Sequence, residues 1–529
     1  MTFIEPAIFI LLFAILSVPI SARFHVPFEI FLVIGSCILS LSPWLPTFQL
    51  NPFIVFNLFL PPILFYAAYF TSWRDFKFNF RPISLLAFGL VIFTMSLVAV
   101  IAKIVLPEFT WAESFLLGAI VSPTDASSAT SIIKKLGAPR RLISILEGES
   151  MLNDATALML FRISLAAILG GSFSFPHVAF HFILITTGGI VLGLMISAIS
   201  VYILPKIHFV TAETTLTFIT AFACYLVGES LGVSGVIATV VGGLYYGRRI
   251  PEIASSQMRI NANASWNTTL FVINGLVFTL IGLELPMILK NLQFHSTSML
   301  IYYALLISIV VILARIIWVF PMAYLPRLFF PSIARKDPMP SWKTLFVLSW
   351  SGVRGIVSLA AALSIPYLTS TGMAFPHRDL ILFITYSVIV ITLIVPTLTL
   401  PIILHLLKLL DEEDELKQEA IARIYSLENS VEYIKELSVK EKIPETVTKD
   451  FLKQIDRRHK VIKTQLESAP YSTLSDEHSA LTKLMYASIE SERKTLITLR
   501  KTGEIRDEVF HRLSDELDIE EMRAKTLRI

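Results

Sequence analysis

Long apolar runs separated by short polar connections fill the first 410 residues of the chain. A helix needs about 20 apolar residues to cross a bilayer, and such runs can be placed near 4–21, 26–43, 50–70, 82–106, 111–134, 142–169, 178–205, 212–229, 233–247, 266–288, 297–325, 343–368 and 379–408. Beyond residue 410, apolar residues recur at three- and four-residue spacing among charges, which is typical of amphipathic helices. The pattern predicts an all-α polytopic membrane domain of thirteen transmembrane helices over 1–410 and a mostly helical tail over 411–529.

The composition and the distribution of charge fit this division. Hydrophobic residues make up 54% of the 529 residues and charged residues 16%, which excludes an ordinary soluble protein. Residues 1–410 carry 23 Lys and Arg against 15 Asp and Glu, whereas residues 411–529 carry 21 against 26. There is no basic domain with a nucleic-acid-binding motif, so we expect no nucleic-acid partner.

The basic residues of the loops predict the orientation. When the loops are placed alternately on the two sides of the bilayer, Lys290 and Arg378 fall on one side. The other side receives Arg23, Arg74, Lys77, Arg81, Lys134, Lys135, Arg140, Arg141, Lys206, Arg248, Arg249, Arg259, Arg327, Arg335, Lys336 and Lys343. The positive-inside rule then puts the tail in the cytoplasm and the N-terminus outside, so we expect a multi-pass protein of the cell membrane, plasma or bacterial inner.

Polar or helix-breaking residues interrupt two of the predicted spans. The fifth contains SPTDASS at 122–128, and the twelfth contains SWSGVRG at 349–355. Unwound backbone at membrane depth is tolerated inside a protein or along a wet cavity, and a pair of broken helices in two halves of a chain points to a transporter site between inverted repeats. Two independent kinks are the alternative. The charges of Asp125 and Arg354 are suited to compensating the ends of the half-helices.

The sixth predicted span carries EGESMLND at 147–154, near its start. On a helix, the four-residue spacing puts Ser150 beside Asp154, with Asn153 next to them and Glu149 on an adjoining face. These side chains offer hard oxygen ligands for an alkali cation and acceptors for a proton, and an ionisable group at membrane depth indicates a functional site. The alternative is that these are first-turn and capping residues; it suits Glu147 well and Asp154 poorly.

With these motifs the chain resembles the sodium/proton exchangers of the cation:proton antiporter-1 family, in particular the bacterial branch with a long cytoplasmic tail. The resembling segments follow one another in family order: SPTD at 122–125, EGESMLNDA at 147–155, SGVIA at 234–238, NGLVFTLIGLELP at 274–286 and VRGIVSLA at 353–360. The resemblance implies a homodimer whose protomers have thirteen helices, inverted repeats and two crossed, broken helices. In each protomer a core domain moves against a dimerisation domain.

The resemblance also implies residue roles. Asp154 is the carboxylate that exchanges the ion, and Na⁺ binds at Asp154, Asp125, Thr124 and Ser150, directly or through water. Glu149 pairs with Arg354 in support, and Asn153 takes the place of a second aspartate found in electrogenic relatives. The chain departs from the commonest form of the first motif at Ala126 and Ser127, which leaves the ligating groups in place.

A single carboxylate that holds either a proton or a cation couples the two fluxes. We therefore expect an electroneutral antiporter that exchanges one monovalent cation for one proton, without a cofactor and without enzymatic activity, and that serves pH and sodium homeostasis. Na⁺ is the expected cation, and a K⁺/H⁺ antiporter is the alternative, with Li⁺ also open, because selectivity cannot be derived from the sequence. A channel would more often show a repeated filter. An enzyme or sensor anchored in the membrane would need a chemical site in the tail, where no such motif is found.

Other charged residues in or near the spans receive structural roles. We expect Arg162 and Arg315 to stabilise the helix bundle through a buried carboxylate or carbonyl partner, and Glu213, Glu229 and Glu284 to lie near helix ends at the interface. For the tail, regulation or dimer contact and a solvated structural extension both remain open.

Overall fold

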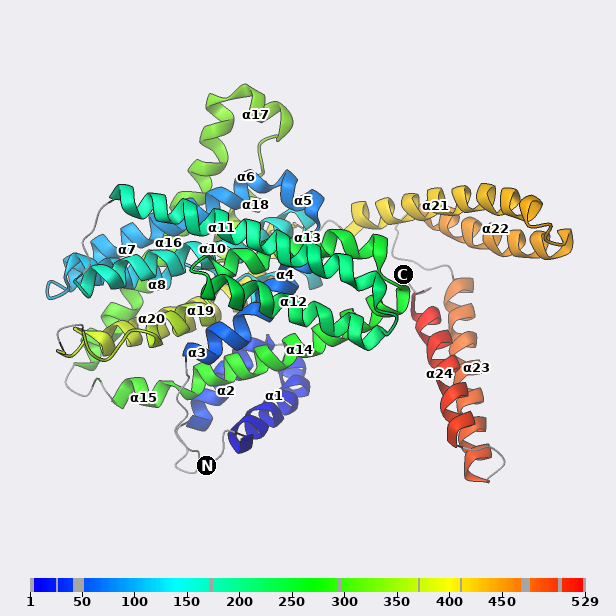
Figure 1. Cartoon of the computed structure of the whole chain (residues 1–529), viewed down its shortest axis with the longest axis horizontal. Helices are drawn as coiled ribbons and strands as arrows, with labels where there is room; N and C mark the ends of the chain where they lie inside the picture. The colour runs from blue at the N-terminus through cyan, green and yellow to red at the C-terminus, as the bar shows by residue number, and fades with distance from the viewer. Residues whose placement is uncertain are drawn as a thin grey trace. The chain divides into compact units, whose positions relative to one another are not determined.

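The computed structural model describes residues 4–24, 27–40, 52–170, 175–290, 292, 296–369, 372–409, 412–467, 476–502 and 507–526. The chain divides into two units, Met1–Leu410 and Asp411–Ile529, at the position where the sequence changes from apolar to charged. Helices make up both units, as Figure 1 shows.

The helices of the first unit follow the predicted spans. Their bounds are α1 Ile4–Phe24, α2 Phe28–Ser40, α3 Pro52–Ile54, η1 Val55–Phe59, α4 Leu60–Phe70, α5 Trp73–Phe78, α6 Phe80–Ser84, η2 Leu85–Leu90, α7 Val91–Val105, α8 Trp111–Val121, α9 Ser127–Lys135, α10 Arg140–Ile168, α11 Phe175–Ile203, η3 Leu204–Lys206, α12 Val210–Ser230, α13 Gly235–Ile253, α14 Ser256–Leu283, α15 Leu285–Lys290, α16 Thr297–Phe329, α17 Pro331–Lys336, α18 Trp342–Trp350, α19 Ile356–Leu363 and α20 Arg378–Leu407.

Among the described residues, eight helices are long and apolar enough to cross a membrane, or up to nine if the bent pair α1 and α2 counts as one span. The multi-pass architecture is therefore confirmed, whereas the count of thirteen remains a prediction. Both predicted breaks are present, because α8 ends at Val121 before α9 begins at Ser127, and α18 ends at Trp350 before α19 begins at Ile356.

The helices of the first unit form two packed groups. In one group, α7, α8, α10, α16, α18 and α20 contact one another; in the other, α1, α2, α4, α11, α12, α13 and α14 do. Glycine allows the closest approach in the second group: a Cβ at Gly247 of α13 would collide with the Tyr69 carbonyl of α4. Helix α10 also contacts α4 and α13, so it lies where the two groups meet.

The two breaks lie against each other. The Asp125 amide donates to the Val353 carbonyl at 2.8 Å, and the two residues form an isolated antiparallel β-bridge. Unwound backbone needs such partners at membrane depth because water is absent there. The break in α8–α9 and the break in α18–α19 thus satisfy part of each other's hydrogen-bonding requirement.

The described residues of the second unit form two helix pairs. Helices α21 (Glu412–Lys440) and α22 (Glu445–Glu467) contact each other, as do α23 (Asp476–Lys501) and α24 (Asp507–Thr526). Ion pairs join the second pair, since Arg493 of α23 binds Asp518 at 2.7 Å and Glu521 at 3.0 Å. The amphipathic pattern beyond residue 410 therefore corresponds to helices in the described part of the tail.

Candidate ion-binding site

A cavity of about 370 Å³ lies between the two groups of helices. One wall comes from α4 and α14 and is largely apolar; the other comes from the α8–α9 break, α10 and the start of α19. All four residues predicted to bind the cation line this cavity, namely Thr124, Asp125, Ser150 and Asp154. The structure therefore brings together residues from two motifs that lie about 25 positions apart in the sequence.

One face of α10 carries the cavity side chains. Glu147, Ser150 and Asp154 recur at three- and four-residue spacing, and all line the cavity. Glu147 binds Lys134 at 2.6 Å, and both side chains are partly exposed, so this pair lies at the open end. Asp154 is seven residues further along, about 10 Å deeper at the helical rise of 1.5 Å per residue.

Because α10 begins at Arg140, Glu147 lies about two turns inside it. The alternative that made Glu147 a first-turn residue is therefore wrong. The helix starts two residues before the predicted span at 142, because Arg140 and Arg141 belong to its first turn, and Leu142, Ile145 and Leu146 are already buried there.

The backbone of the break fixes the Asp125 carboxylate. Its Oδ1 accepts from the Ser127 amide at 2.9 Å. Gly355, from the other break, approaches so closely that an added Cβ would lie 2.5 Å from Asp125 Oδ2. Asp125 also interacts electrostatically with Asp154, so two carboxylates face the same cavity.

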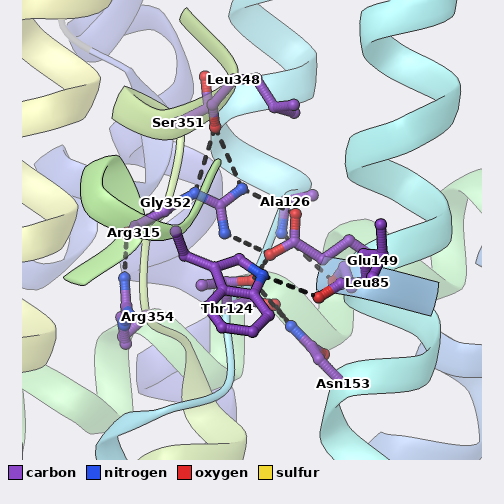
Figure 2. Close-up of polar contacts among 12 residues, drawn as sticks. Leu85, Thr124, Ala126, Glu149, Asn153, Arg315, Leu348, Ser351, Gly352 and Arg354 are labelled. Carbon is purple, nitrogen blue, oxygen red and sulfur yellow. Dashed lines mark hydrogen bonds and ion pairs between the residues drawn. The ribbon is translucent and has the colours of Figure 1, made fainter. Parts of the chain in front are cut away.

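Thr124 and Ser150 also hold the broken segment in place. The Ser150 hydroxyl accepts from the Ala126 amide at 3.3 Å. The Thr124 hydroxyl donates to Glu149 Oε1 at 2.7 Å and accepts from Asn153 Nδ2 at 2.7 Å, and the same amide nitrogen donates to the Thr124 carbonyl at 2.8 Å (Figure 2). Each hydroxyl oxygen keeps a lone pair that could bind a cation.

Glu149 does not pair with Arg354 as predicted from the resemblance; its partner is Arg315 of α16. Two guanidinium nitrogens of Arg315 bind the two carboxylate oxygens, one of them at 2.7 Å, as Figure 2 shows. Both side chains are buried, with exposures of 1% and 2%. Arg315 also donates to the Leu348 carbonyl, which confirms the expectation that it stabilises the bundle through a carboxylate or carbonyl partner.

Arg354 binds the ends of the broken helices instead. Its Nε donates to the Val121 carbonyl at 3.2 Å and its Nη1 to the Gly352 carbonyl at 2.6 Å. Val121 is the last residue of α8, so the guanidinium compensates the negative end of that half-helix. The predicted role of Arg354 at a half-helix end is confirmed, and the predicted pairing with Glu149 is wrong.

Arg162 of α10 has a carboxylate partner, as predicted, because it binds Glu229 at the end of α12 at 2.8 Å. Both side chains are partly exposed, so the prediction that this partner is buried is wrong. Glu284 directly follows α14, which confirms its predicted place at a helix end, and its side chain is buried, with an exposure of 2%.

These features, paired broken helices and half-buried carboxylates that meet at one cavity, are typical of a membrane ion transporter. A family model described as "Sodium/hydrogen exchanger, transmembrane" matches residues 8–406. The chain therefore belongs to the sodium/hydrogen exchanger family of cation:proton antiporters, which confirms the resemblance and places the protein in a family of transporters.

Individual relatives agree with the family model. The chain is 31% identical over 518 residues to the uncharacterized Na⁺/H⁺ exchanger YjcE of Escherichia coli, covering 91% of each chain. It is 34% identical over 368 residues to the sodium, potassium, lithium and rubidium/H⁺ antiporter of Bacillus subtilis, covering 67% of this chain and 54% of that one. The structure of the sodium proton antiporter MjNhaP1 from Methanocaldococcus jannaschii superimposes with a TM-score of 0.60 at 20% identity, over 76% of this chain and 98% of that one, so the fold is shared.

Proposed function

We propose that the chain exchanges one Na⁺ for one proton, and that Asp154 is the carboxylate that holds either ion. The observation that carries this proposal is the position of Asp154, which lies at membrane depth on the cavity between the two helix groups and beside three further oxygen-bearing side chains. A carboxylate that holds a proton cannot at the same time neutralise a cation, so binding of the two ions is competitive.

Asp125, Thr124 and Ser150 complete the proposed Na⁺ site. Their oxygens are hard ligands of the kind that alkali cations prefer. The pairing of the two breaks holds Asp125 in place, and the Ala126 amide donates to Ser150. The Ser127 amide donates to the Asp125 carboxylate and so holds it beside the proposed site.

The neighbours of Asp154 support a stoichiometry of one to one. Arg315 neutralises Glu149, and Asn153 carries no charge. Asp154 is then the one group whose charge changes when Na⁺ replaces H⁺, so the loaded site has the same charge in both directions and exchange is electroneutral.

Alternating access follows from the arrangement of the two helix groups. The cavity opens beside Lys134 and Glu147, on the side that the positive-inside rule makes cytoplasmic. Beyond Asp154, a second cavity of about 270 Å³ is lined by Leu158, Arg162 and Glu229, and the ion pair Arg162–Glu229 ties α10 to α12 there. Sliding of one helix group against the other would close the ion cavity on the side of Lys134 and Glu147 and would break the Arg162–Glu229 ion pair.

Three further features belong to this proposal. They are the full set of thirteen spans with inverted repeats, a homodimer formed through the group that contains α1 and α2, and a cytoplasmic, regulatory tail over 411–529. The cell membrane is the proposed location. A K⁺/H⁺ antiporter is the second candidate, because the name of the Bacillus subtilis relative includes potassium, lithium and rubidium.

Proton flux in proteoliposomes tests the proposal. An inward gradient of Na⁺, K⁺ or Li⁺ should drive proton movement in liposomes that hold the wild-type protein, most strongly with Na⁺. Asp154→Asn should abolish the flux while the protein remains folded, because the amide keeps the shape of the side chain but carries neither ion. Coupled flux that survives in Asp154→Asn would assign the exchange to another carboxylate, with Asp125 as the first to be tested.

A further inference from the structure

A separate cavity of about 220 Å³ lies within the group that contains α10, on the basic side of the membrane domain. Its walls come from η2, the start of α10, the end of α16 and the start of α18, and they include Leu86, Leu142, Val319 and Leu345. None of these residues lines the ion cavity. The transport mechanism leaves this cavity without a role.

Three arginines line the same cavity, and they are incompletely neutralised. Arg141 donates to Asp337 Oδ1 at 2.7 Å and Arg327 pairs with the other carboxylate oxygen. Arg81 interacts electrostatically with Arg327 and Asp337, yet its buried Nη2 has no hydrogen-bond partner among the described residues. Three guanidinium groups thus surround one carboxylate.

A buried donor without an acceptor is unfavourable by about 1–3 kcal/mol, and by more when the donor is charged. An acceptor is therefore needed close to Arg81, and an anionic group with several oxygens would supply it and also offset the excess positive charge of the three arginines. A phosphate group meets this requirement, because guanidinium and phosphate form strong charge-assisted hydrogen bonds.

The walls determine what else the ligand contains. The lining between the arginines and Leu348 is apolar apart from Thr344, so a purely ionic ligand would leave it facing water. Pockets for drug-sized ligands measure about 300–1,000 Å³, so this cavity is smaller and suits part of one hydrocarbon chain. Phe78, Phe80, Met339 and Trp342, next to the cavity residues in sequence, are exposed apolar side chains, as expected at a membrane interface.

We propose that this cavity binds one anionic phospholipid of the cytoplasmic leaflet, with its phosphate on Arg81 and the first part of an acyl chain between α10, α16 and α18. Basic pockets between transmembrane helices on the cytoplasmic side are suited to anionic head groups. The deep end of the cavity reaches Leu348, whose carbonyl accepts from Arg315. The lipid therefore packs against the segment that orients the ion pair Arg315–Glu149.

Native mass spectrometry of the purified, delipidated full-length protein tests this proposal. The probe is phosphatidylglycerol added in detergent, with phosphatidylcholine as the uncharged comparison. Wild-type protein should retain phosphatidylglycerol in preference to phosphatidylcholine. Arg81→Gln should lower this retention about fivefold, the effect expected for one basic residue at a lipid phosphate.

Three more variants make the test specific. Arg74→Gln, which removes an exposed charge on α5 outside the cavity, should retain the lipid as the wild type does. Arg81→Lys should retain most of it because the charge remains. Ala323→Phe fills the apolar part while keeping all three arginines, and it should lower retention as Arg81→Gln does.

Several results would overturn the proposal. They are equal retention in Arg81→Gln and Arg74→Gln, equal retention of the two lipids by the wild type, or displacement of the lipid by millimolar glycerol phosphate, which would indicate a site for a water-soluble anion. Sodium-driven proton flux of each variant reports whether it is folded. If Ala323→Phe does not fold, the comparison of Arg81→Gln with Arg81→Lys and Arg74→Gln still decides the question.

Discussion

Arg315 of α16 and Glu149 of α10 form a buried, bidentate ion pair. The Glu149 carboxylate also accepts a hydrogen bond from Thr124, a residue that lines the ion cavity. The pair therefore joins three elements of one helix group, α10, α16 and the α8–α9 break. Since Thr124 lines the cavity, a change in the pair should reach the ion site through a single hydrogen bond.

Arg315→Ala should destabilise the protein more than Arg354→Ala. Removal of Arg315 leaves the Glu149 carboxylate buried without its counter-charge, which typically costs about 3–5 kcal/mol, whereas Arg354 binds carbonyl groups and its loss leaves no buried charge. Thermal unfolding of the purified variants measures the order. The double variant Arg315→Ala/Glu149→Gln should recover part of the loss, because no unpaired charge remains. The reverse order, or a double variant less stable than both single ones, would show that the pair is not what stabilises this region.

Asn153→Asp should destabilise the protein and should not create a second ion carrier. Both hydrogen bonds of Asn153 to Thr124 use the amide as the donor, and a carboxylate would turn an acceptor toward the Thr124 carbonyl. An unsatisfied buried group costs about 1–3 kcal/mol, and more when charged. Thermal unfolding of Asn153→Asp is compared with that of Asn153→Ala. Both variants lose the amide donor, so any further loss of stability in Asn153→Asp measures the effect of the added charge. A stable Asn153→Asp variant that transports electrogenically would contradict this prediction.

Gly355→Ala should lower exchange without preventing folding. The backbone at Gly355 is extended, with φ of −121°, so alanine can adopt it; but its Cβ would lie 2.5 Å from Asp125 Oδ2 and displace the carboxylate. Displacement of a ligating group by about 1 Å can cost about 100-fold in rate. Sodium-driven proton flux at equal protein density measures the loss. The matched control is Gly275→Ala on α14, whose added methyl would meet the Ala14 side chain; this variant should transport normally. Equal flux in the two variants would contradict the prediction.

Exchange should not respond to membrane potential. In liposomes with a fixed pH gradient, Na⁺ flux should be the same whether or not valinomycin and K⁺ impose a potential, because one charge moves in each direction. A net charge moved per cycle would feel about 2.3 kcal/mol per 100 mV, enough to change the rate clearly. A response to potential would add a second proton carrier, and its loss in Asp125→Asn would identify that carrier.

The sequence predicts the elements and the cavity residues better than it predicts their partners. Helical spacing places Ser150 and Asp154 on one face because both belong to one helix, and polar residues within apolar runs reveal both breaks. The partner of Glu149 depends on which of two distant arginines, Arg315 or Arg354, comes close after the helices pack. Sequence spacing within one helix holds no information about that choice.

Glu284 illustrates the same limit in another form. Its position after the last residue of α14 is predicted correctly, and a helix end usually indicates the interface. Whether a helix end is covered depends on its neighbours, here α2, α15 and α20 around the end of α14. The lipid cavity is a third case, since its arginines come from α6, α10 and α16 and share no motif.

The mutual support of the two breaks has a consequence for how this transporter could diversify. The oxygen ligands belong to one helix group, in which the Val353 carbonyl holds Asp125 and the hydrogen bond from Ala126 to Ser150 joins the break to α10. Helices α4 and α14 supply an apolar wall without a ligand of their own among the residues proposed to bind Na⁺. Substitutions in that wall can alter the speed of sliding without disturbing the coordination geometry. Turnover and ion preference should therefore be separable traits in this chain, adjustable by mutation in different helices.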